Sequence, residues 1–96
     1  MPLFAVQYAY DDRHDLQGTI RPEHRAYLRH VTDEGQLLGS GPFTDGAPGA
    51  LLIFRADDRE TLDRLLAGDP FARAGVIATT TVRPWELVLG AWSTSA

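Results

Sequence analysis

Residues 3–10 restrict the possible folds more than any other segment, because they are apolar on both sides of an extended chain. Two alternating sets of side chains are present: Leu3, Ala5 and Ala9 on one side, and Phe4, Val6, Tyr8 and Tyr10 on the other. A strand of this kind is expected inside a sheet, with both faces covered. A chain of 96 residues can bury one core, so we expect a single domain over residues 1–96 with its core at about 3–89.

The rest of the chain contains two helical patterns. A helix is expected over about 22–34, where Arg21-Pro22-Glu23 has the pattern of a helix start. A second helix is expected over about 58–67, because Asp57 and Glu60 have the spacing of a capping box. The remaining segments are predicted as strands at 36–43, 50–54 and 76–89, a docked Trp92, and a loose tail at 93–96.

The predicted order is strand, helix, strand, strand, helix, strand, which is the ferredoxin-like βαββαβ arrangement of the α+β class. Right-handed crossovers then give a four-stranded antiparallel sheet in the order 4-1-3-2, with both helices on one face. Pro42 and Pro84 fall on the edge strands, where a missing N–H is tolerated. The helix-free face would expose one apolar side of residues 3–10, so we expect a homodimer that buries this face.

His24 and Asp69 are the best candidates for a chemical site. In this topology the start of the first helix and the turn after the second helix meet at one end of the sheet. An aspartate bound to one imidazole nitrogen would fix the tautomer and leave the other nitrogen as a base near neutral pH. The alternative is structural, with His24 bonded to a backbone carbonyl and Asp69 capping the turn before Pro70.

Three more residues are expected around the same pocket. Arg21 lies one helical turn before His24, and its guanidinium could receive an anionic substrate, although a surface role is also open. Ser40 could bond a ligand or be a plain strand residue. Tyr8 could line the pocket or serve the core or a dimer interface. Together these residues favour a small-molecule ligand that carries negative charge.

Composition excludes several kinds of chemistry. The chain has no lysine and no cysteine, which removes Schiff-base and thiol catalysis, zinc–thiolate sites and disulfides. A formal net charge of -4 without a basic stripe argues against nucleic acid. His24 and His30 lie on different faces of the predicted helix and no phosphate-binding glycine pattern occurs, so neither a metal nor another cofactor is expected. No apolar stretch reaches membrane-spanning length and no signal peptide is visible, so a cytoplasmic protein is expected.

Four short motifs occur in a fixed order along about residues 3–86. They are Arg21-Pro22-x-His24-x-x-Tyr27-Leu28, Gly35-x-Leu37-x-x-x-Gly41-Pro42, Asp69-Pro70-Phe71-x-x-Ala74-Gly75 and Val82-x-Pro84. In this order they resemble the YciI-like (YCII-related) family. The resemblance implies a domain of the dimeric α+β barrel group, with His24 and Asp69 as the active pair. It also implies proton abstraction with isomerisation or elimination on a phenolic ligand, as in a related dehydrochlorinase of a chlorinated hydroxyquinol.

Three functions are compatible with this fold. The first is a cofactor-independent lyase, isomerase or dehydrochlorinase that uses His24 as general acid/base and Asp69 to orient it. The second is a non-catalytic small-molecule-binding or regulatory domain, which sequence does not separate from the first. The third is an RNA-binding domain, but residues 51–54 lack the aromatic and glycine pattern of the RNA-recognition motif. The hairpin at 44–49 is shorter than in many relatives, which leaves the pocket size and the substrate open.

Overall fold

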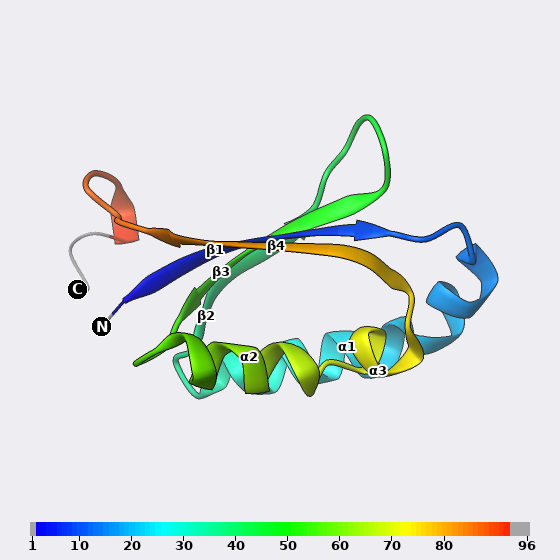
Figure 1. Cartoon of the computed structure of the whole chain (residues 1–96), viewed down its shortest axis with the longest axis horizontal. Coiled ribbons are helices and arrows are strands. Elements are labelled where there is room, and N and C mark those ends of the chain that lie inside the picture. The colour runs from blue at the N-terminus through cyan, green and yellow to red at the C-terminus, as the bar shows by residue number, and fades with distance from the viewer. Residues whose placement is uncertain (1, 93–96) are drawn as a thin grey trace.

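The computed structural model describes residues 2–92 and contains a four-stranded antiparallel sheet (Figure 1). Its strands are β1 (Leu3–Tyr10), β2 (Leu37–Pro42), β3 (Gly49–Arg55) and β4 (Ile77–Trp85). Their spatial order is β2-β3-β1-β4, which is the predicted order read from the opposite edge. Pro42 and Pro84 lie on the two edge strands, as expected. The predicted α+β fold is therefore confirmed, while the loose tail predicted at 93–96 lies outside the described residues.

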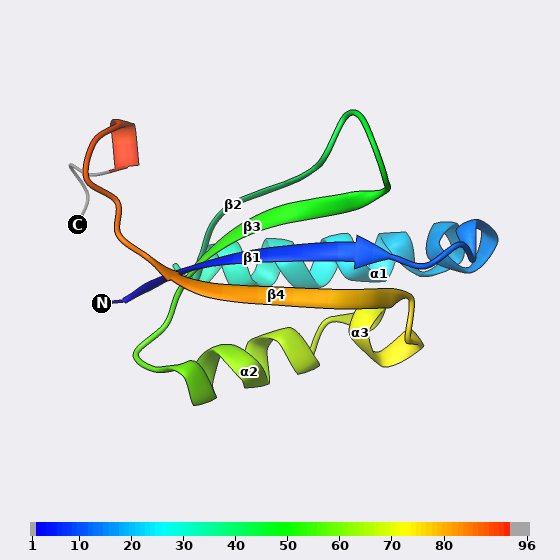
Figure 2. The same ribbon diagram turned by 45° about the horizontal axis from the view of Figure 1, so that its top comes forward.

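Helices cover one face of the sheet, as Figures 1 and 2 show. They are α1 (His14–Asp33), α2 (Arg59–Ala67) and the short α3 (Pro70–Ala74). The core lies between these helices and the sheet, and its side chains come from β1, β3 and two helices: Phe4, Val6, Tyr8, Leu52, Phe54, Val31 and Leu62. Burial alternates along β1, because Gln7 and Ala9 on the opposite face are exposed. A single chain therefore covers the helix side of the sheet, while on the opposite side it buries Ile53 but leaves Gln7, Ala9 and Leu51 exposed.

The start of α1 differs from the prediction. The helix begins at His14 rather than near residue 22, and Pro22 lies inside it. A proline inside a helix removes one backbone hydrogen bond, here the bond to the carbonyl of Gly18, and its ring crowds that same carbonyl, so Pro22 lowers the stability of α1. His24 consequently lies in the helix interior, away from the first turn where the helix dipole acts.

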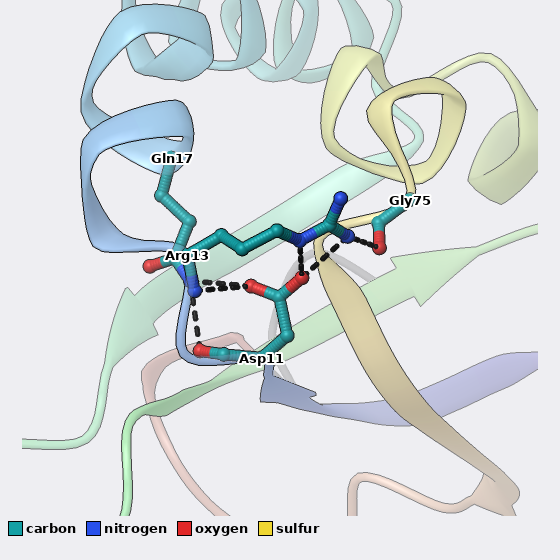
Figure 3. Close-up of polar contacts among 4 residues, drawn as sticks. All are labelled: Asp11, Arg13, Gln17 and Gly75. Carbon is teal, nitrogen blue, oxygen red and sulfur yellow. Dashed lines mark hydrogen bonds and ion pairs between the residues drawn. The ribbon is translucent and has the colours of Figure 1, made fainter.

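A polar cluster in the segment between the predicted strand and the predicted helix fixes the beginning of α1 (Figure 3). The carboxylate of Asp11 accepts hydrogen bonds from the backbone N–H of Arg13 and from the buried side chain of Gln17. The Arg13 guanidinium donates to Asp11 and also to the carbonyl of Gly75, the residue that ends α3. This long-range bond connects the first turn of α1 to α3, and no local sequence pattern announces it.

The cap of α2 and the segment after Asp69 also differ from the prediction. The capping residue of α2 is Asp58 rather than Asp57, and its side chain accepts a hydrogen bond from the backbone N–H of Thr61. The predicted turn after Asp69 is the helix α3, which ends at Gly75 with a left-handed φ of 74°. The predicted docking of Trp92 is confirmed, because a Cβ on Gly39 would lie only 2.8 Å from the Trp92 ring.

Candidate active site

The candidate site is a buried pair of side chains, His24 of α1 and Asp69 from the connection between α2 and α3. His24 Nδ1 lies 2.7 Å from Asp69 Oδ1. The two residues are 8% and 1% exposed. Only tertiary structure joins residues this far apart in the chain, and the structure brings them together as the topology predicted. Their role in catalysis stays a prediction.

The backbone of α3 holds the Asp69 carboxylate in place. Asp69 caps α3, and its Oδ1 accepts a hydrogen bond of 2.9 Å from the backbone N–H of Phe71. Pro70 occupies the first turn, where a missing N–H costs nothing. A carboxylate oxygen can only accept, so the His24 Nδ1–H must donate the second bond at Oδ1. The Nε2 of a neutral imidazole is then the unprotonated nitrogen, which can act as a base.

Aromatic contacts fix the orientation of the imidazole. The His24 ring stacks on Phe71, with ring centroids 3.9 Å apart and an interplanar angle of 5°. Tyr10 packs edge-on against the same Phe71 ring at a centroid distance of 5.6 Å. Stacking and hydrogen bonding thus restrain the histidine from two directions, so little reorganisation is needed before it accepts a proton.

The second oxygen of Asp69 is unusual. Oδ2 is buried and, within residues 2–92, has no hydrogen-bond partner. A carboxylate with one unsatisfied oxygen in a low-dielectric interior acts strongly on its neighbours. Burial raises the pKa of Tyr8 and Tyr10, and the Asp69 charge raises both pKa values further. These two phenols therefore stay protonated near neutral pH and can donate hydrogen bonds, but they are not bases.

A cleft of about 260 Å³ opens beside His24, between α1 and the helix-facing side of β2 and β3. Its lining combines two cations, hydroxyl groups and apolar surface: Tyr10, Arg21, His24, Arg25, Leu28, Ser40, Gly41, Pro42, Ala50, Leu52 and Phe71. The volume is near the lower end of small-molecule sites, which favours a ligand of about one ring.

The cleft contains three of the predicted site residues, His24, Arg21 and Ser40. Asp69 bonds His24 without forming part of the lining. Tyr8 does not line this cleft, because it is a core residue with 3% exposure, and Tyr10, the next residue on the same side of β1, takes the position expected for it. Arg25 was not predicted. Its signal was present in the sequence, because a spacing of four residues places it on the same side of the helix as Arg21.

Two broader expectations concern metals and membranes. Across residues 2–92, no three side chains of the His, Cys, Asp or Glu type are grouped so that they could hold a metal ion. The expectation that no cofactor is needed stays a prediction. In the same part of the chain, no helix is both long and apolar enough to cross a membrane.

Comparison with known proteins gives matches over most of the chain. The model of the YCII-related domain matches residues 1–86. Protein YciI of Escherichia coli O6:H1 is 31% identical, with 86% of this chain and 96% of that protein covered. An uncharacterized protein of Haemophilus influenzae is 27% identical, with 90% and 99% covered.

Two solved structures share the fold at lower identity. One is 5-chloro-2-hydroxyhydroquinone dehydrochlorinase (TftG) from Burkholderia phenoliruptrix in complex with 2,5-dihydroxybenzoquinone. It has a TM-score of 0.77, 22% identity, and coverage of 88% of this chain and 93% of that one. The other is SnoaB, a cofactor-independent oxygenase from Streptomyces nogalater, with a TM-score of 0.52, 11% identity, and coverage of 94% and 95%. The chain therefore shares its fold with two enzymes, one of which is described as a cofactor-independent oxygenase.

Proposed function

Because this chain belongs to the YCII-related family, we propose that it is a small-molecule enzyme of the lyase or isomerase kind that transfers protons with His24. The observation that carries this proposal is the buried His24–Asp69 hydrogen bond of 2.7 Å at the wall of a ring-sized cleft. A base, a partner that orients it and a pocket beside it are the parts that acid–base catalysis needs. No cofactor is invoked in this proposal.

In the proposed reaction, His24 Nε2 takes a proton from a hydroxyl group or an activated carbon of the substrate. The Asp69 carboxylate stabilises the imidazolium that forms and keeps Nδ1 protonated throughout. The imidazolium then returns the proton to another atom, which gives isomerisation, or the substrate expels a leaving group, which gives elimination. Tyr10 and Ser40 are positioned in the lining to donate hydrogen bonds to developing negative charge on the substrate.

A chlorinated trihydroxybenzene is a suitable probe, because its elimination needs only proton transfers. Two hydroxyl protons leave, one proton is added to the carbon that bears chlorine, and chloride departs with the electrons of the C–Cl bond. The balance is the loss of HCl and the formation of a hydroxyquinone, with no external oxidant. We choose 5-chloro-2-hydroxyhydroquinone, the compound in the name of the dehydrochlorinase that shares this fold.

The experiment follows chloride release from 5-chloro-2-hydroxyhydroquinone, together with binding of 2,5-dihydroxybenzoquinone by calorimetry. We expect chloride release above the rate in buffer, with one monohydroxyquinone formed for each chloride released. Binding of 2,5-dihydroxybenzoquinone without chloride release from the probe would favour the alternative of a non-catalytic binding domain. The absence of both would contradict the proposal for this substrate class.

We also propose that the protein is a homodimer whose helix-free sheet faces pack together. Leu51 and Trp85 on this side of the sheet are 37% and 39% exposed in the single chain. The strand register places Leu51 opposite Gln7, and both are exposed on the side of the sheet away from the helices, whereas Ile53 on the same side is already buried in the single chain. Burying such a surface against a second copy is a common solution for a sheet with helices on one side only.

Leu51→Asp should convert this dimer into a monomer, because it places a charge at the centre of the proposed interface without touching the core. Analytical ultracentrifugation at micromolar concentration measures the change. Ala26→Asp, which adds the same charge at an exposed position of α1, is the control and should leave the dimer intact. A monomeric wild type, or a Leu51→Asp variant that remains dimeric, would overturn this assignment.

A further inference from the structure

The geometry points to a carboxylate-binding subsite in the cleft, formed by the guanidinium groups of Arg21 and Arg25. This inference rests on the proposed function and names its substrate class: a small ring or short chain that bears a carboxylate. The two arginines lie four residues apart on α1, with His24 between them in sequence, and all three line the cleft. A bound carboxylate would therefore lie close to the proposed base.

Within residues 2–92, neither Arg21 nor Arg25 forms an ion pair or a hydrogen bond through its side chain. Arg13, Arg59 and Arg64 pair with carboxylates, and the remaining arginines resemble Arg21 and Arg25 in having no ion pair in this part of the chain. The cleft lining includes no aspartate or glutamate that could neutralise them. The two cations therefore give the outer wall of the cleft positive charge, in a chain whose formal net charge is -4, while the Asp69 carboxylate is bonded to His24 outside the lining.

Burial indicates how a ligand would be oriented. His24 is buried, Arg21 is partly buried and Arg25 is exposed, so the arginines lie nearer to solvent than the base. Arg21 also lies within reach of Tyr10, because its charge lowers the pKa of that phenol against the stronger opposing effects of burial and of the Asp69 charge. A carboxylate held by the guanidinium groups would leave the body of the ligand between Leu28 and Leu52, with its reacting atom toward His24.

The chain also contains a matched control. Arg29 continues the same helical row and lines a shallow outer groove with Arg21 and Arg25, but it is not part of the cleft lining. Removing Arg29 changes the net charge and the field along α1 by the same amount as removing Arg25. A specific subsite therefore predicts different effects for the two, and general attraction of anions predicts equal effects.

The test compares binding of hydroquinone and 2,5-dihydroxybenzoate, which differ by one carboxylate on the same ring, measured by calorimetry or by chemical-shift titration. In the wild type we expect the carboxylated compound to bind about 10- to 100-fold more tightly, the range expected for charge-assisted hydrogen bonds. Arg21→Gln and Arg25→Gln should each remove most of this preference, and Arg29→Gln should keep it. Arg25→Lys should restore only part, because an ammonium lacks the bidentate geometry.

Three results would overturn the subsite. They are equal binding of the two compounds by the wild type, no binding of 2,5-dihydroxybenzoate at millimolar concentration, and an equal loss in Arg29→Gln. The proposed function is tested by a different measurement, which is chloride release. If wild-type protein releases chloride from the chlorinated probe without any preference for carboxylates, only the subsite is wrong. If the preference exists but no substrate is turned over, the subsite stands and the protein binds its ligand without catalysis.

Discussion

His24→Gln should lower kcat/KM for the chlorinated probe by about 10²- to 10⁴-fold, the usual contribution of a general acid–base group. Glutamine keeps a similar length and can still donate a hydrogen bond to Asp69, so the core around Asp69 and Phe71 should remain folded. What disappears is the imidazole Nε2, which is the proposed proton acceptor. Steady-state chloride release measures the effect, and circular dichroism and sedimentation verify the fold and the assembly.

Asp69→Asn should cause a loss of similar size, and the double variant should be little worse than either single one, because a base and its orienting partner act as one unit. The asparagine oxygen can keep the cap on Phe71, but it no longer supplies the negative charge that stabilises an imidazolium. His30→Gln is the control, since His30 is an exposed histidine of the same helix. Full activity in His24→Gln, or additive losses in the double variant, would contradict the assigned roles.

Gly49→Ala should destabilise the fold by about 3 kcal/mol, at the upper end of the cost of overpacking. A Cβ on this buried glycine would lie 2.3 Å from the backbone oxygen of Tyr8 on the paired strand β1. Backbone atoms cannot move aside as a flexible side chain can, so the ends of β1 and β3 would have to separate. Ala50 and Tyr10, which adjoin this point, line the cleft, and ligand binding should weaken as well.

Chemical denaturation measures this change as a lower midpoint for Gly49→Ala. Gly41→Ala on the edge strand β2 is the matched control, because nothing lies within 4 Å of the added Cβ and its φ is not positive. We expect the control to match the wild type within about 0.5 kcal/mol, as is usual for unstrained surface substitutions. Equal stability of Gly49→Ala and wild type would mean that β1 and β3 are less closely paired than described.

The sheet could be predicted from sequence because each strand carries its own signal. Residues 3–10 are apolar on both alternations, residues 50–54 are continuously apolar, and the prolines mark the edges. The start of α1 could not be predicted in this way. The first turns of α1 are polar and carry no apolar helical pattern. They are held by contacts that involve Asp11, Gln17 and the distant carbonyl of Gly75. Pro22 strengthened the error, because proline favours a helix start without requiring one.

The candidate site could also be predicted only in part. Topology alone places His24 near Asp69, since the order of the elements decides which ends meet. Whether Tyr8 or Tyr10 reaches the cleft depends on how far the cleft extends along β1, and a period of two residues gives both the same face. The stacking of His24 on Phe71 requires the position of α3, a segment whose sequence indicated only a turn.

Among the described residues that line the cleft, His24 is the one proposed proton acceptor, and this has a stereochemical consequence. An arginine side chain offers no acceptor, burial raises the pKa of Tyr10, and serine is too weak an acid or base, so the proposed proton exchange falls to His24. A single base must remove and deliver hydrogen on the same face of a bound molecule. Any isomerisation in this cleft would therefore be suprafacial, and part of the migrating hydrogen would be retained in the product instead of exchanging fully with solvent.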